Sequence, residues 1–517
     1  MMSNVVYTVY RGTFIHLTRL PESPSRSKPQ LVRNSGTIWV STEDGRIKGL
    51  DWSAGDEESF GALMARNGWV DINNTQKSGA GDVKVQVVTA DEARNEFFFP
   101  GFIDTHIHAP QYPNAGLFGS TTLLDWLEAY TFPVESGFGA TNTTPTNDPK
   151  DTPPSALRIY DQVIARTLSH GTTCASYFAT VHVPATNALA ALSHKRGQRA
   201  FIGRVCMDNP SFCPEYYRDA TAEESLTSTQ SVIEYIHTLD PKGHLIKPII
   251  TPRFVPTCTK PALESLGTLA ASYSPPLHIQ THISENLNEV ALVEELFPGD
   301  TYAGVYDKYN LLTKRTILAH AVHLSSSERA LIRARDAKIS HCPASNSALG
   351  SGIAPVRTFL DEGLTVGLGT DVSGGYSPSI LEAARQACLA SRLLGHTVSF
   401  SEEKSENCEV GREKLSVEES LYLATRGGAA VIDMADELGG FEEGMIFDAQ
   451  LIQLGSVAPI GGLLEGTGDV LVDGPVGNVD LFGTETWEEK IQKWFWSGDD
   501  RNVKAVWVAG RLVHHRA

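Results

Sequence analysis

The sequence predicts an α/β protein built around a (β/α)8 TIM-like barrel, with a small β-sandwich domain formed by the two ends of the chain. Eight apolar, β-branched runs separated by helix-like segments occupy the middle of the chain, and eight parallel strands close such a barrel. The two ends instead alternate apolar and polar residues. We therefore expect a composite β-sandwich over residues 1–98 and 440–517, and a catalytic barrel over residues 99–439.

Composition limits the class of protein. The chain has 517 residues, more than the roughly 100–200 of a typical domain, so it is long enough for a large barrel and a smaller domain. The hydrophobic fraction of 41% is that of a soluble globular protein, and no apolar run approaches the roughly 18–20 residues that span a bilayer. The net charge of -18 opposes binding to a phosphate backbone. We expect no membrane and no nucleic acid polymer among the partners.

The N-terminus and the cysteines indicate the compartment. The stretch MMSNVVYTVYRGTFIHL alternates like a strand and lacks the basic region and cleavage site of a signal peptide. Seven scattered cysteines without a CxxC pair suggest reduced thiols and speak against a cysteine-bound metal. We expect a cytoplasmic protein.

The β-like ends contain a turn signal and two interruptions. In SGTIWVSTEDGRIKGLDW, Asp44-Gly45 is a dipeptide favoured in hairpin turns, because both positions accept positive φ. MIFDAQLIQL and VKAVWVAGRLV repeat the strand texture near the C-terminus. Polar, Gly-rich stretches that begin at Pro21 and Gly55 are predicted to be loops or insertions.

Polar side chains follow the predicted barrel strands at their C-terminal ends, where this fold places functional residues. The eight runs are GFIDTHIH, TTCASYFATVH, RAFIGRVCMD, LIKPIITPRF, LHIQTHISE, TILAHAVHL, KISHCPAS and TVGLGTDVS. The polar residues at their ends are His106, His108, Arg253, His282, Glu285, His320 and Asp371.

Four of these residues form a candidate metal site. His106 and His108 occupy positions i and i+2 of one strand, so their side chains point the same way. With His282 and Asp371 they supply three imidazoles and one carboxylate, a set suited to zinc, with iron a plausible substitute. Each of them alone could be an ordinary buried polar residue, but four at four barrel-end positions favour a metal.

One metal ion per chain is the expectation. Two-metal sites of this kind usually need a further bridging anion, such as a modified lysine, and Lys247 lies at the other end of the fourth run. A single ion with an open coordination position lowers the pKa of a bound water toward about 7.

Two further residues are candidates for proton transfer. Glu285, three residues after His282, could shuttle a proton from the water to a leaving group, a role worth about 10²- to 10⁴-fold; alternatively, it could complement a helix dipole. His320 could be a ligand, a donor to the water or substrate, or a core residue, and we favour the donor. We expect His323 and His341 to be structural.

Seven motifs follow one another from about Glu96 to the C-terminus: PGFIDTHIHAPQY, LLDWLEAYTFPVE, TPRFVPTC, QTHISEN, HCPASNSALGSG, GLGTDVSGG and SGDDRNVKAVWVAGRLV. Together they resemble the guanine deaminase family of the amidohydrolase superfamily. The resemblance implies a zinc-dependent homodimer that hydrolyses guanine to xanthine and ammonia in purine catabolism or salvage. It assigns the metal to the four residues above and the proton shuttle to Glu285. Our own mechanistic hypothesis adds Asp371 as a second proton relay.

The same resemblance assigns substrate contacts to Gln111, Arg253 and Phe254, beside the donor His320. A planar guanidinium matches the O6/N7 acceptor edge of guanine, whereas adenine presents an N6 donor there. Phe254 could stack against the purine face. Without the resemblance, Gln111 would be an ordinary loop residue and Arg253 a surface arginine.

Two alternatives stay open. Another mononuclear amidohydrolase deaminase could act on 8-oxoguanine, a pterin, cytosine or a triazine. A catalytically silent scaffold is the other, and the loss of a metal ligand would mark it. Insertions near residues 21–36, 54–90 and 398–414 depart from the family's compactness and bear on oligomer contacts more than on chemistry.

Overall fold

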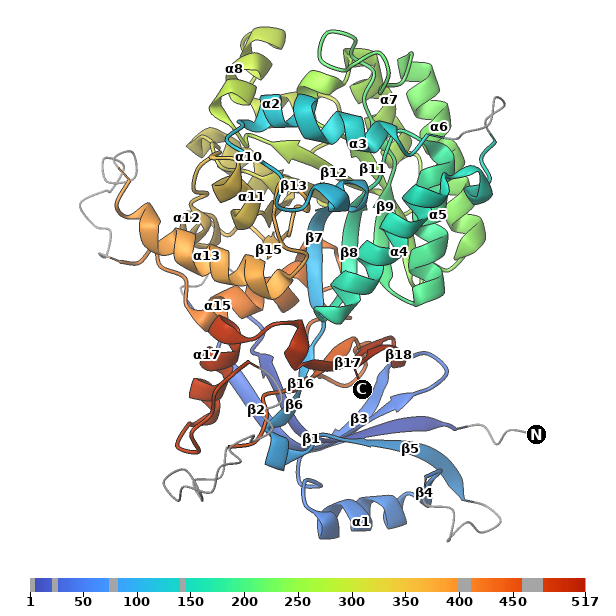
Figure 1. Cartoon of the computed structure of the whole chain (residues 1–517), viewed down its shortest axis with the longest axis vertical. Coiled ribbons are helices and arrows are strands. Elements are labelled where there is room, and N and C mark those ends of the chain that lie inside the picture. Colours follow the sequence, from blue (N-terminus) through green and yellow to red (C-terminus); the bar gives the residue numbers. More distant parts are fainter. Residues whose placement is uncertain are drawn as a thin grey trace, which may run out of the picture.

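Two β-sheets organise the protein (Figure 1). The computed structural model describes residues 5–20, 27–73, 82–139, 146–397, 411–457 and 478–516. One sheet is a parallel barrel and the other is built from both ends of the chain. Helices long and apolar enough to cross a bilayer are absent from the described part of the chain.

The barrel contains eight parallel strands among the described residues, and each predicted run contributes one of them. Its sheet closes between the first strand and the segment after the last, where Asp371 N–H donates to His106 O (2.9 Å) and His108 N–H donates to Val372 O (3.0 Å). The predicted eight-stranded barrel is confirmed. The strands are β7 (Phe102–His108), β8 (Thr172–Phe178), β9 (Arg199–Gly203), β11 (Ile246–Pro252), β12 (His278–Ile283), β13 (Thr316–His320), β14 (Lys338–His341) and β15 (Val366–Leu368), with the short β10 (Val205–Cys206) beside β11.

Helices surround the barrel (Figure 1). Several begin at a side chain that accepts a backbone N–H, as Thr221 does at the start of α6. The apolar side of α4, including Tyr160, Val163 and Ile164, is buried. These helices are α4 (Pro154–Ser169), α5 (Val183–Arg196), α6 (Ala222–Leu239), α7 (Lys260–Ala271), α8 (Leu287–Leu296), α9 (Tyr302–Lys308), α10 (Ser326–Ala334), α11 (Pro343–Ala348), α12 (Val356–Asp361), α13 (Ile380–Leu394), α15 (Val417–Tyr422) and α16 (Gly428–Val431).

The second sheet brings the two ends of the chain together. Strand β6 pairs antiparallel with β16, so that Phe98 lies opposite Leu451. Strands β2 and β3 form an antiparallel pair, and the turn between them contains Asp44 and Gly45 as predicted. The turn is longer than the two residues predicted, and of the pair only Gly45 has a positive φ, +67°. The described strands of this sheet are β1 (Tyr7–Leu17), β2 (Leu31–Ser41), β3 (Ile47–Asp51), β4 (Trp69–Asp71), β5 (Val83–Thr89), β6 (Glu96–Pro100), β16 (Ala449–Gln453), β17 (Val503–Val508) and β18 (Arg511–His515).

The stretch from Gly55 is more ordered than a loop. It contains α1 (Glu57–Arg66), which Asp56 caps, and β4, so the loop prediction is wrong for these residues. Of the other predicted insertions, residues 21–26, 74–81 and 398–410 lie outside the described residues, whereas residues 31–36 belong to β2 and residues 83–89 form β5. Six cysteines are free and buried, and Cys408 lies outside the described part.

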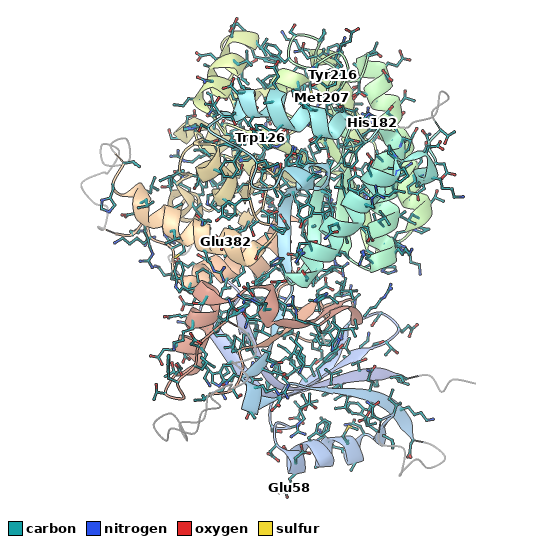
Figure 2. All side chains as sticks on the ribbon, in the orientation of Figure 1. Glu58, Trp126, His182, Met207, Tyr216 and Glu382 are labelled. Atoms are coloured by element: carbon teal, nitrogen blue, oxygen red, sulfur yellow. The ribbon has the colours of Figure 1, made fainter. Side chains whose placement is uncertain are left out.

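The barrel's N-terminal end faces the second sheet. Strand β7 leaves β6 almost directly and rises into the barrel, and α2 (Leu123–Trp126) and α3 (Phe132–Ser136) lie above its far end (Figure 1). Figure 2 places Trp126 and Tyr216 at that far end and Glu58 at the opposite extreme of the molecule. The C-terminal mouth of the barrel is therefore remote from the second sheet.

Candidate active site

Four buried side chains converge at the C-terminal mouth of the barrel. His106 and His108 come from β7, His282 from β12, and Asp371 follows β15. One ligand atom from each of the four residues can be chosen so that these atoms all lie within 4.8 Å of one another. Asp371 Oδ1 lies 3.0 Å from His106 Nε2 and 3.4 Å from His108 Nε2, and the Nε2 atoms of His108 and His282 are 3.1 Å apart. The structure thus brings together the residues that the sequence predicted as metal ligands.

This cluster fits a divalent metal ion. His106 Nε2 is buried and, although it lies 3.0 Å from Asp371 Oδ1, it makes no hydrogen bond of regular geometry among the described residues, so a metal ion would satisfy it. His282 Nδ1 lies 2.6 Å from Arg253 O, to which it donates, and this contact leaves Nε2 with a free lone pair for a metal. Three imidazole nitrogens and one carboxylate are a donor set that zinc accepts.

The backbone around the cluster is strained. His320 (φ +73°), Asp371 (φ +48°) and Ser284 (φ +47°) adopt the left-handed conformation that glycine normally takes. Such residues cost on the order of 1–3 kcal/mol each and persist where the surrounding fold holds them. The barrel rim therefore fixes the direction of Asp371, which belongs to the cluster, and of His320, which lies beside it.

Glu285 lies two residues beyond β12 and points toward His320. Its Oε2 is 3.4 Å from His320 Nε2, and its Oε1 accepts a hydrogen bond from Ser351 Oγ at 2.9 Å. Burial raises the pKa of Glu285 to about 7, the range that suits proton transfer near neutrality. The helix-capping role belongs to Glu289 instead, whose Oε2 accepts the N–H groups of Glu285 and Asn286 at the start of α8.

His320, the last residue of β13, is held by polar neighbours. Its Nδ1 donates to Asn346 Oδ1 at 2.9 Å, so Nε2 faces Glu285 and also Asp371 Oδ2, which is 3.7 Å away. Burial disfavours the charged ring, but the carboxylates of Glu285 and Asp371 outweigh that effect and raise the pKa of His320. His320 can therefore act as a hydrogen-bond donor at this position.

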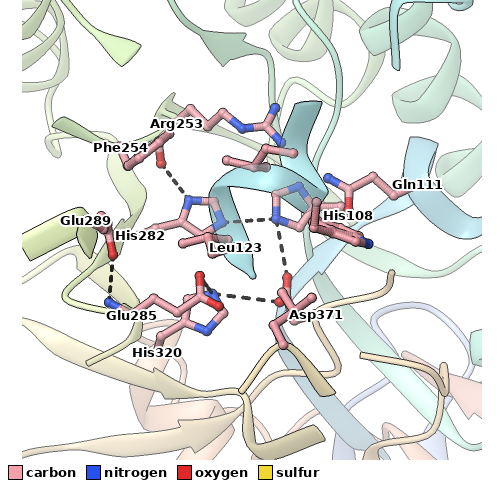
Figure 3. Close-up of a pocket in the computed structure, with 13 residues that line it drawn as sticks. His108, Gln111, Leu123, Arg253, Phe254, His282, Glu285, Glu289, His320 and Asp371 are labelled. Atoms are coloured by element: carbon pink, nitrogen blue, oxygen red, sulfur yellow. Dashed lines mark hydrogen bonds and ion pairs between the residues drawn. The ribbon is translucent and has the colours of Figure 1, made fainter. Parts of the chain in front are cut away.

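A pocket lies beside the cluster (Figure 3). One side of the pocket is polar and includes members of the four-residue cluster, and the other side is apolar. The residues predicted to contact substrate all line it. The lining residues are His108, Gln111, Leu123, Trp126, Leu127, Arg253, Phe254, His282, Glu285, Glu289, His320, Leu349 and Asp371.

Arg253 is paired inside the protein. It is only 2% exposed, which rules out a surface arginine, and its Nη1 and Nη2 donate to Glu135 at 2.8 and 3.3 Å. Gln111 Nε2 donates to the same carboxylate at 2.6 Å. The sequence analysis assigned no role to Glu135, although an acidic residue within the apolar stretch AYTFPVESG was a signal of a buried charge.

Three other residues considered from the sequence lie outside the proposed ligand set. His323 Nε2 lies 2.7 Å from Ser351 O, and Lys247 is the second residue of β11, at the end of the barrel away from the site. Cys342 lies near His106 and His320, but burial raises the pKa of its thiol well above the usual range, which opposes a thiolate ligand. Asn346 and Ser351, which orient His320 and Glu285, were not predicted.

Comparison with known proteins agrees with this geometry. The amidohydrolase family model matches residues 97–513, most of the chain. The chain belongs to the amidohydrolase family. A probable guanine deaminase of Schizosaccharomyces pombe is 46% identical over 419 residues, which cover 81% of this chain and 71% of the relative. The guanine deaminase of Dictyostelium discoideum is 38% identical over an alignment of 521 positions, which covers 99% of each chain.

A solved amidohydrolase structure shows the same likeness. The guanine deaminase of C. acetobutylicum, with guanine bound in its active site, matches with a TM-score of 0.72 at 29% identity, over 98% of this chain and 100% of that one. The resemblance to guanine deaminases that the motifs predicted is confirmed.

Proposed function

We propose that this amidohydrolase is a guanine deaminase, which hydrolyses guanine to xanthine and ammonia. The observation that carries the proposal is the convergence of the four-residue metal cluster with Glu285 at a pocket lined by Gln111, Arg253 and Phe254. The guanine deaminases among its relatives support the same substrate. The complete ligand set argues against a silent scaffold.

We propose one zinc ion per chain, held by His106, His108, His282 and Asp371. When bound, such an ion lowers the pKa of a water molecule toward about 7, which makes a nucleophile available at neutral pH. The donor set of three imidazoles and one carboxylate is compatible with iron as well, so metal analysis of the purified protein decides between zinc and iron.

The pocket residues orient the base. Arg253 uses two of its five N–H donors on Glu135, so the others remain for the O6/N7 edge of guanine. Phe254 packs against the purine face, and Gln111 contacts the ring from the opposite wall. This orientation directs C2 of guanine toward the metal cluster.

Proton transfer falls to Glu285 and its neighbours. The Glu285 carboxylate accepts a proton from the attacking water and passes it to a ring nitrogen beside C2. His320 Nε2 donates to the oxygen that has joined C2, which stabilises the tetrahedral carbon. Glu285 or Asp371 then relays the water's second proton to the amino group. The C2–N bond breaks, and ammonia leaves.

Other expectations accompany this function. We infer that residues 99–439 form the catalytic barrel domain and that residues 1–98 and 440–517 form a second, composite β-sandwich domain. We also infer a cytoplasmic homodimer that acts in purine catabolism or salvage.

A substrate panel tests the activity. Purified protein is incubated with guanine, adenine, cytosine, 8-oxoguanine, a pterin and a triazine, and ammonia release is measured. Release from guanine alone supports the proposal. Release from another compound alone would keep the metal site and overturn the substrate assignment.

A further inference from the structure

The Glu135 carboxylate is the centre of a buried polar network. Its side chain is fully buried, and Arg253, Gln111 and Tyr217 all donate to it. Oε2 accepts from Arg253 Nη1 at 2.8 Å and from Tyr217 Oη at 2.5 Å, and Oε1 accepts from Gln111 Nε2 at 2.6 Å and Arg253 Nη2 at 3.3 Å. These four hydrogen bonds match the roughly four lone-pair sites of an ionised carboxylate.

This network holds both proposed base-contacting residues in place. The amide of Gln111 is fixed at its other end as well, because its Oε1 accepts the Ser373 N–H at 3.3 Å. The guanidinium of Arg253 also lies over the Phe132 ring, 5.3 Å from its centroid. Glu135 itself is not among the pocket-lining residues, so it acts on a ligand through Arg253 and Gln111.

The network also sets the charge of the wall that Arg253 contributes to the pocket. Arg253 alone would place an uncompensated cation, 2% exposed, on the pocket wall, whereas the Arg253–Glu135 pair carries no net charge. Charge in a buried site acts strongly on a charged ligand, because little water screens it. Substrate and product differ in this respect: guanine is neutral near pH 7, whereas xanthine is more acidic and loses a proton readily at mildly alkaline pH.

We propose that Glu135 is a positioning residue that also keeps the substrate side of the pocket neutral, so that the anionic form of the product xanthine is not retained. The inference rests on the proposed guanine deaminase activity. Removing the carboxylate charge leaves the Arg253 cation exposed to the ligand. Anionic purines then bind more tightly, and neutral purines do not.

Glu135→Gln tests this, since the amide has nearly the same shape, lacks the charge and keeps one of the two acceptor oxygens. Dissociation constants for xanthine and hypoxanthine are measured by ligand-induced quenching of tryptophan fluorescence at pH 8.5, where xanthine is largely anionic and hypoxanthine largely neutral. Trp126 lines the pocket and serves as the probe. We expect the ratio of the hypoxanthine to the xanthine dissociation constant to be at least about tenfold higher in Glu135→Gln than in the unaltered protein, because xanthine binds more tightly to the variant. Equal changes for both ligands would reduce Glu135 to a structural role and overturn the proposal.

Two further variants complete the test: one keeps the Glu135 charge, and the other removes the Arg253 charge. Tyr217→Phe removes one hydrogen bond from Glu135 and keeps its charge, so the xanthine-to-hypoxanthine ratio should stay unchanged. Arg253→Gln leaves the Glu135 anion uncompensated, so xanthine should weaken relative to hypoxanthine even if Glu135→Gln does not fold. A ratio that fails to fall in Arg253→Gln would contradict the proposal.

Binding measurements separate this inference from the function on which it rests. Failure of the unaltered protein to deaminate guanine would overturn the proposed function. Normal guanine turnover together with an unchanged ligand ratio in Glu135→Gln would overturn only the role of Glu135.

Discussion

Glu285 Oε2 lies 3.4 Å from His320 Nε2, and both side chains are buried at the mouth of the barrel. Ser351 orients the carboxylate from one side and Asn346 orients the imidazole from the other. Neither Glu285 nor His320 belongs to the four-residue metal cluster, so each is free to handle protons. This pair gives the site a proton acceptor and a hydrogen-bond donor next to the proposed metal site.

Glu285→Gln should keep the metal and lose turnover. The amide cannot carry the proton, so we expect kcat to fall by about 10²- to 10⁴-fold while metal content per chain stays the same. Steady-state ammonia release and metal analysis measure the two quantities. Glu294→Gln, on the exposed side of α8, is the matched control and should leave kcat unchanged. Full activity in Glu285→Gln would remove Glu285 from its role.

His282→Ala should lose both metal and activity. The variant removes one of four ligands and leaves the orienting contact to Arg253 O unmade, so metal affinity should fall by at least about 10-fold. Metal content is measured after dialysis against a weak chelator. The exposed His515→Ala serves as a control that should retain a full complement of metal. Retention of metal by His282→Ala would show that the cluster is not the binding site.

Asp448→Asn should destabilise the protein. The Asp448 carboxylate accepts two hydrogen bonds from Arg199 on β9, at 3.1 and 3.2 Å, and one from Ala509 N–H in the second sheet at 2.7 Å. Breaking a buried pair of this kind costs about 3–5 kcal/mol in the free energy of unfolding. Urea unfolding measures the loss. Asp436→Asn, at an exposed ion pair with Arg19, should change stability by less than about 1 kcal/mol, and equal losses in both variants would contradict the prediction.

His278 should make the protein less stable in acid. Burial, together with the neighbouring cations Arg315 and Lys247, lowers its pKa to about 3 in the folded state, whereas an unfolded chain has a histidine pKa of about 6.5. The unfolded chain therefore binds the proton first. The stability contributed by neutral His278 is complete above about pH 6.5 and is lost as the pH falls toward about 3.

The comparison of two pH values measures this effect. Between pH 7.5 and 5.0, the unaltered protein should lose about 2 kcal/mol more unfolding free energy than His278→Gln, because one such group changes stability by about 1.4 kcal/mol per pH unit below 6.5. Urea unfolding at each pH gives the values. The variant and the unaltered protein would show the same loss if His278 were protonated in the folded state.

The barrel and most of the candidate site could be predicted because their signals are local. Each barrel strand is a short apolar run, and the residue that ends it occupies the barrel mouth by the geometry of parallel strands. Glu135 could not be found in this way, because its contact with Arg253 joins residues 118 positions apart. The pairing of β6 with β16 is similarly non-local, and α1 was missed because its polar, Gly-containing sequence resembles a loop.

The most direct test of the account is ammonia release from guanine as a function of zinc bound per chain. Metal-free protein is prepared with a chelator, zinc is added back in steps, and activity and bound metal are measured together. We expect activity to rise in proportion to bound zinc and to level off at one ion per chain. Guanine turnover by the metal-free protein, or an inactive protein with one zinc bound, would contradict it.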